Sequence, residues 1–173
     1  MEKLSLDQWN EAPTSALVTY IIDHFHDRLK IQIPQINLLF KKELGNKSNK
    51  EYTADIIAAF HLFSEFAHQM HFHLLQEETV AFPLLLAMEK NKTPENLKKL
   101  TPIITAMEQD HQDDLTFIAS IQKYTHNFRP PLSASENLKL LFTSLKELIQ
   151  DLQLHIEMEN NLVFKRFKTV DPA

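Results

Sequence analysis

The chain has 173 residues, 43% of them hydrophobic and 24% charged, and a formal net charge of −5. Its single glycine argues against a β-meander, sandwich or barrel, which need many tight turns, and its acidic balance gives no footprint for nucleic acid. The lack of cysteine excludes disulfides and thiolate-held clusters. No apolar run approaches the ~20 residues of a membrane span or forms a signal-peptide core. We therefore expect a cytoplasmic protein that binds no membrane.

Clusters of helix-breaking residues divide the chain into four long helical patterns. The clusters lie at 45–49, 91–94 and 128–133. We expect helices at roughly 14–43, 52–88, 95–127 and 134–167, preceded by a lead-in segment, 1–13, and followed by a tail, 168–173. The short connections predict an all-α fold, an up-down-up-down antiparallel four-helix bundle over 14–167.

Local signals refine the helix ends. Thr14 or Ser15 is the expected N-cap of the first helix, Thr93 and Pro94 open the third, and Ser133 or Ser135 caps the fourth. Pro83 predicts a bend in the second helix. Pro102 predicts a late start or a kink in the third.

Each predicted helix carries a buried stripe at spacings of three and four residues, and each stripe contains a histidine. The first two stripes are Ile22, His26, Leu29, Ile33, Ile36, Phe40 and Ile56, Phe63, Phe66, Met70, His73, Glu77, Val80. The other two are Leu100, Ile104, Met107, His111, Leu115, Ile118 and Leu141, Leu145, Leu148, Leu152, His155, Glu159, Leu162. A bundle core does not accept such polar groups unless they satisfy one another or bind something.

A ten-residue frame occurs twice. HLLQEETVAF at 73–82 returns as HIEMENNLVF at 155–164, with His first, Glu four places later and Phe last. Positions i and i+4 share one helix face, so each copy directs an imidazole and a carboxylate to one point. A single such pair is often an ordinary surface pair, but the repeat in phase with His26 and His111 favours a buried site.

These six residues predict a site for two metal ions. His26, His73, His111 and His155 supply two imidazoles per ion, and Glu77 and Glu159 are shared between the ions. Imidazole and carboxylate without thiolate fit iron, manganese or zinc. His24, His68 and His71 fall on other helix faces and His126 lies near the end of its helix, so these four are expected at the surface. His61 lies over three turns before His73, too far along the helix axis to share the site.

The same motifs resemble the hemerythrin-like HHE cation-binding domain, most closely the iron–sulfur-cluster repair proteins. The likeness covers about 8–167 and includes the two frames, MEQDH at 107–111 and HDR at 26–28. It implies iron ligands at His26, His73, His111 and His155, with bridging carboxylates from Glu77 and Glu159. Some relatives have a further histidine between the first two motifs, whereas residues 27–60 of this chain contain none. Repair proteins also often begin with a cysteine-containing domain, whereas this sequence has no cysteine.

The resemblance implies a di-iron protein, oxo- or hydroxo-bridged, that acts in nitric-oxide or oxidative stress and in iron–sulfur cluster repair. Its expected partners are nitric oxide, dioxygen or peroxide, and damaged iron–sulfur proteins. The alternatives are an oxygen- or nitric-oxide-binding sensor without turnover, and a structural bundle that holds zinc or no metal. Gln69 and Glu108 are candidates for orienting His73 and His111. Phe63, Phe66, Met70, Met107 and Leu152 are expected to wall off the site from water.

Overall fold

The computed structural model describes residues 9–46 and 53–168, and within these ranges the chain is helical, with no strand. Four helical segments span 14–44, 53–89, Pro94–Tyr124 and 136–167. They match the predicted helices to within about three residues at each end. Most of the predicted lead-in (1–13) and tail (168–173) lies outside the described residues.

The helix ends follow local hydrogen bonding. The hydroxyl oxygens of Thr93 and Ser135 accept from the backbone N–H groups of Asn96 and Leu138, which confirms the predicted starts of α5 (Pro94–Tyr124) and α6 (Glu136–Met158). The predicted cap at Thr14 or Ser15 is wrong. Pro13 occupies the N-cap position of α1 (Thr14–Ile21), and the Thr14 N–H donates to the Glu89 carboxylate instead.

The third segment is continuous and ends earlier than predicted. Pro102 lies inside α5, so the late start expected from this proline is wrong. Beyond Tyr124, His126, Asn127 and Phe128 adopt positive φ angles of 50°, 55° and 60°. Three successive left-handed residues cannot extend a right-handed helix, which is why the segment stops before the predicted residue 127.

Three segments contain a single π-helical turn. Residues Ile22–His26 join α1 to α2 (Asp27–Leu44), and Glu77–Ala81 join α3 (Thr53–Gln76) to α4 (Phe82–Glu89). Glu159–Val163 follow α6 and lead into a 3₁₀ turn, Phe164–Phe167. The irregularity near the end of the second segment therefore precedes Pro83, which lies in the first turn of α4. Isolated π turns are rare and occur frequently at functional sites.

The π turn at Glu77–Ala81 overturns one predicted core position. Val80 extends the α-helical stripe of His73 and Glu77, yet its side chain is 47% exposed. The extra residue of a π turn rotates the following helix by about one α-helical step of 100°. Ala81 and Phe82, each 1% exposed, take the core positions instead.

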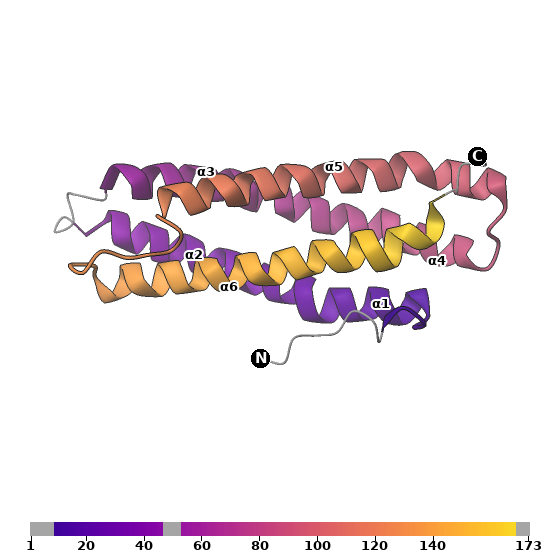
Figure 1. Ribbon diagram of the computed structural model, residues 1–173, viewed down its shortest axis with the longest axis horizontal. Helices are drawn as coiled ribbons and strands as arrows, with labels where there is room; N and C mark the ends of the chain where they lie inside the picture. The colour runs from indigo at the N-terminus through magenta and orange to yellow at the C-terminus, as the bar shows by residue number, and fades with distance from the viewer. Residues whose placement is uncertain (1–8, 47–52, 169–173) are drawn as a thin grey trace.

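The helical segments lie side by side in an elongated bundle (Figure 1). α2 packs against α3 and α6, and α3 packs against α5. The buried apolar residues form two clusters, one around Phe40, Phe63 and Leu145 and the other around Leu17, Phe82 and Phe167. No helix within 9–46 and 53–168 has the length and hydropathy of a membrane span.

A polar layer lies between the two apolar clusters. On each segment a histidine stands between a residue of one cluster and a residue of the other, as His155 does between Leu152 and Met158. The fold therefore brings one imidazole from each helical segment to a common level along the bundle.

Candidate metal centre

The structure brings all six predicted residues together in this layer. His26 ends the first π turn, while Glu77 and Glu159 begin the other two. His73, His111 and His155 project from α3, α5 and α6. Five of the six residues are fully buried, and His73 is 5% exposed.

The six side chains form two overlapping groups of potential metal ligands. His26 and His155 make up one half-site with Glu77 and Glu159, and His73 and His111 make up the other with the same two glutamates. Within each group one ligand atom per residue lies within 4.8 Å of all the others. The predicted division, two imidazoles per half and both carboxylates shared, is the arrangement that the side chains adopt.

Distances show how the carboxylates are shared. Glu77 Oε2 lies 3.4 Å from both His26 Nε2 and His73 Nε2, and Glu77 Oε1 lies 3.9 Å from His111 Nε2. Glu159 places Oε1 at 2.9 Å from His155 Nε2 and Oε2 at 3.1 Å from His111 Nε2. Each glutamate therefore reaches both half-sites.

Several buried nitrogen and oxygen atoms of the six side chains have no hydrogen-bond partner among the described protein atoms. Both carboxylate oxygens of Glu77 and of Glu159, and the Nε2 atoms of His73 and His111, are buried without a hydrogen-bond partner among the described residues. Across the other half-site, the Nε2 atoms of His26 and His155 face each other at 3.1 Å. Since buried polar groups are almost always satisfied, this set fits a pair of cations.

The pKa values of the layer shift in different directions from group to group. Burial, reinforced by the neighbouring Glu159 charge, raises the pKa of Glu77 well above its usual range. Burial alone would also raise the pKa of Glu159, but the imidazoles beside it, His155 foremost, lower it well below that range. Burial lowers the pKa of His73 to about 4 and also lowers that of His155. Burial alone would lower the pKa of His111 as well, but the Glu159 carboxylate beside its ring raises it. Neutral imidazoles and ionised carboxylates are the forms that ligate metal, so a bound cation would favour the neutral form of His111 and the ionised form of Glu77.

Three imidazoles are oriented by hydrogen bonds from their outer nitrogen. His26 Nδ1 donates to Glu78 Oε1 at 2.9 Å, His73 Nδ1 to Asp110 Oδ2 at 3.3 Å, and His111 Nδ1 to Asn160 Oδ1 at 2.9 Å. Such bonds fix the ring so that Nε2 faces the centre. His155 Nδ1 is buried and has no partner within the described chain.

The two predicted orienting residues do not have this role. Gln69 is exposed, and Glu108 pairs with Lys168. Glu78, Asp110 and Asn160 each stand next to one of the six site residues in the sequence. That adjacency is the signal by which they could have been found, because a helix turns the neighbour of an inward residue toward the adjoining helix.

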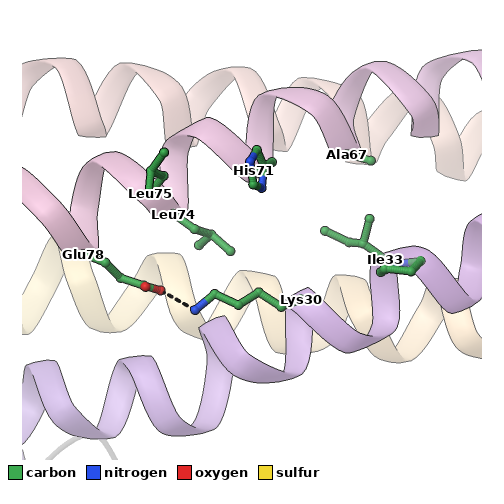
Figure 2. A pocket seen from close by; sticks show the side chains of 8 residues that line it. Lys30, Ile33, Ala67, His71, Leu74, Leu75 and Glu78 are labelled. Atoms are coloured by element: carbon green, nitrogen blue, oxygen red, sulfur yellow. Dashed lines mark ion pairs between the residues drawn. The ribbon is translucent and has the colours of Figure 1, made fainter.

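The support of His26 extends to the surface. Lys30 Nζ lies 2.8 Å from the same Glu78 oxygen that accepts from His26, and Figure 2 shows this pair beside a pocket between α2 and α3. Ile33, Pro34, Ala67, Leu74 and Leu75 supply most of its wall. His26 is thus held by a carboxylate that is itself paired with a surface cation.

Aromatic rings cover the imidazoles. Phe25 stacks on His155, Phe82 on His26 and Phe164 on His111, with ring centroids 5.6, 5.7 and 6.0 Å apart. Phe82 and Phe164 are the last residues of the repeated frame, whose purpose the spacing alone did not show. The five predicted wall residues are buried as well, so apolar groups enclose the layer from both ends of the bundle.

The five remaining histidines lie outside the site, as expected. His24, His61, His68, His71 and His126 are all exposed. His61 and His126 are also distant from the six-residue layer along their helices. None of the five belongs to the two groups of potential ligands found among the described residues.

Comparison with known proteins gives this geometry a family. Residues 17–167 match the hemerythrin HHE cation binding domain. The chain belongs to this family. Its family membership and the buried His/Glu layer together indicate a pair of iron ions as the cofactor.

Curated relatives of this hemerythrin-type chain carry a more specific name. It is 30% identical over 159 residues to the iron-sulfur cluster repair protein YtfE of Pectobacterium carotovorum, covering 91% of this chain and 67% of the relative. The proteins of the same name from Musicola paradisiaca and Escherichia coli O81 are 28% and 27% identical, over 95% and 91% of this chain and 70% and 68% of theirs.

Proposed function

We propose that this protein is a di-iron protein of hemerythrin type that acts in the repair of iron–sulfur clusters damaged by nitric oxide or oxidants. The observation that carries the proposal is the layer of six buried side chains, in which both carboxylate oxygens of Glu77 and of Glu159 and the Nε2 atoms of His73 and His111 have no hydrogen-bond partner among the described residues. The repair role is suggested by the names of the relatives. The predicted up-down-up-down order of the helices and the predicted cytoplasmic location belong to this proposal.

The proposed iron ligands are His26, His73, His111 and His155, with Glu77 and Glu159 bridging. Bound iron would supply the affinity for nitric oxide, dioxygen or peroxide that the protein groups lack. The side chains have three tasks. The carboxylates balance the charge of the cations, the Nδ1 hydrogen bonds hold the rings in place, and Phe25, Phe82 and Phe164 keep bulk water out.

Metal analysis is the first test. Protein purified without added metal should contain two irons per chain, one for each half-site. A single zinc ion, or no metal, would refute the proposal. Ultraviolet and visible spectra of the oxidised protein then show whether the two irons interact.

Repair is tested separately from metal content. The reduced, iron-loaded protein is mixed with an enzyme whose iron–sulfur cluster has been damaged by nitric oxide, and recovery of that enzyme is followed. Recovery faster than with the same amount of ferrous salt supports repair. Equal recovery, together with a stable nitric-oxide or dioxygen adduct, would instead support a sensing role.

A further inference from the structure

A polar cavity lies on the other side of α3 from the largely apolar pocket of Figure 2 and adjoins the His73/His111 half-site. Its volume is about 350 Å³. Three carboxylates of α5 and the imidazoles of His68 and His73 line it, together with two glutamines of α3. Gln69, Gln76 and Asp113 are exposed, so the cavity opens to solvent.

Asp114 distinguishes this cavity from an ordinary acidic surface. The residue is only 3% exposed, and its Oδ2 is buried without a hydrogen-bond partner among the described residues. A carboxylate oxygen buried in this way is costly unless something charged or hydrogen-bonding meets it. Because Asp114 also lines the cavity, an occupant of the cavity can supply that partner.

The cavity is in direct contact with the buried site. Asp110, on its wall, accepts the hydrogen bond of His73 Nδ1, while His73 Nε2 faces Glu77 on the inner side of the ring. His73 is also the one site residue with measurable exposure, at 5%. A single imidazole therefore separates the cavity from one half-site.

We propose that this cavity binds a hydrated divalent cation through Asp110, Asp113 and Asp114, and that cations exchange between solvent and the His73/His111 half-site through it. The inference rests on the proposed metal-binding function. Carboxylate and water oxygens are the ligands of hard divalent cations, which often keep several waters when bound.

Manganese binding tests the cavity directly. The iron-loaded full chain is titrated with Mn²⁺, and the electron paramagnetic resonance signal of the free hydrated ion reports how much is bound. We expect one additional Mn²⁺ per chain, and an affinity reduced by about tenfold or more in Asp114→Asn and in Asp113→Asn. Asp113 is exposed, so its replacement does not disturb the core.

Asp55→Asn is the matched control, since it removes one carboxylate that lies near the start of α3 and contacts His126. It should bind Mn²⁺ as the unaltered protein does. If the Asp113 and Asp114 variants also bind Mn²⁺ unchanged, or if the control loses as much affinity as they do, the proposed cavity site is wrong.

Exchange is tested by the rate at which a ferrous chelator removes iron from the reduced protein. Asp114→Asn should slow the removal about tenfold without changing the amount of iron bound at the start. The iron content tests the proposed function, and the removal rate tests the exchange route, so the two proposals can be refuted separately. A protein without iron refutes the proposed function, whereas a normal iron content with equal rates in the variant, the control and the unaltered protein refutes only the exchange route.

Discussion

The two half-sites have the same kinds of ligand but different surroundings. In the His26/His155 half-site, one ring is held by Glu78, which pairs with Lys30, and the other ring is fully buried against Phe25. In the His73/His111 half-site, one ring is held by Asp110 at a solvent-open cavity, and the other by the neutral amide of Asn160. The repeat in the sequence therefore duplicates the ligands but not their surroundings, and two ions bound here would have different access to solvent.

Replacing a shared carboxylate should have the largest effect, because it damages both half-sites at once. Glu77→Ala and the isosteric Glu77→Gln should lose most of both ions, with affinity lowered by more than about a hundredfold, since even indirect partners of metal ligands are worth about 10–100-fold. His155→Ala should also lower bound iron sharply. Metal binding stabilises the fold, so the melting temperature should fall in parallel. Elemental analysis and thermal unfolding measure both effects.

The controls for this loss are His24→Ala and His68→Ala, because both rings are exposed and belong to neither group of ligands. Their equilibrium iron content should match that of the unaltered protein. Equal losses in all the variants would mean that the assignment of buried and surface histidines is wrong.

Unequal access should make iron leave in two phases. A chelator is expected to remove one ion faster than the other, by about tenfold or more, because one half-site adjoins the open cavity. His73→Ala should abolish the fast phase and keep the slow one, whereas His61→Ala should keep both. Stopped-flow absorbance of the chelate measures the rates, and a single phase of full amplitude would remove the proposed difference between the halves.

The pH dependence of the metal-free protein should report the buried carboxyl beside the His73/His111 half-site. Burial raises the pKa of Asp114 from its ordinary value of 3.8 to about 7, although His111 opposes the shift. The folded state therefore holds this proton more tightly than the unfolded state. The associated stability is present below pH 3.8 and is lost as the pH rises toward 7.

Asp114→Asn should consequently gain stability relative to the unaltered protein as the pH rises from 4 to 7, by on the order of 1–4 kcal/mol, and the gain should level off above pH 7. Urea unfolding of the two proteins at several pH values measures the difference. Asp55→Asn should show no comparable trend, and a flat difference for Asp114→Asn would contradict the raised pKa.

The smallest effect is expected at the surface end of the His26/His155 half-site. Lys30→Ala removes the 2.8 Å ion pair with Glu78 but leaves Glu78 to hold His26. Lys30 is nearly half exposed, so the cost in stability should be about 0–1 kcal/mol. Iron affinity should fall by no more than about tenfold. Thermal unfolding and metal competition test this, with Lys99→Ala, which breaks the exposed pair with Glu95, as the control.

Much of the fold and the ligand set was predictable, because both depend on periodicity. Each helical stripe indicates which face is buried, and a charged or polar residue within a stripe indicates where a polar layer interrupts the apolar core. His26, His73, His111 and His155 were found in this way, and so were Glu77 and Glu159. The comparisons bear out the resemblance to the hemerythrin family, and the ligand roles themselves remain a prediction.

The errors at the site have two causes: an irregular turn in the backbone and contacts that cross from one helix to another. Val80 was placed in the core because the stripe was continued across a turn that contains an extra residue. Gln69 and Glu108 lie one turn before a ligand, whereas the orienting groups stand beside ligands in the sequence and reach across to neighbouring helices. Such contacts depend on how the helices are rotated against each other, which a single sequence does not reveal.

The π turns also limit where residues can be inserted into or deleted from this chain. Three of the six site residues begin or end such a turn, and Phe82 and Phe164, which cover two imidazoles, directly follow one. Loss of one residue between Glu77 and Phe82 would restore α-helical winding and turn Phe82 away from His26. Insertions and deletions can be absorbed between the helices, but within the ten-residue frame the distance along the chain is itself part of the site.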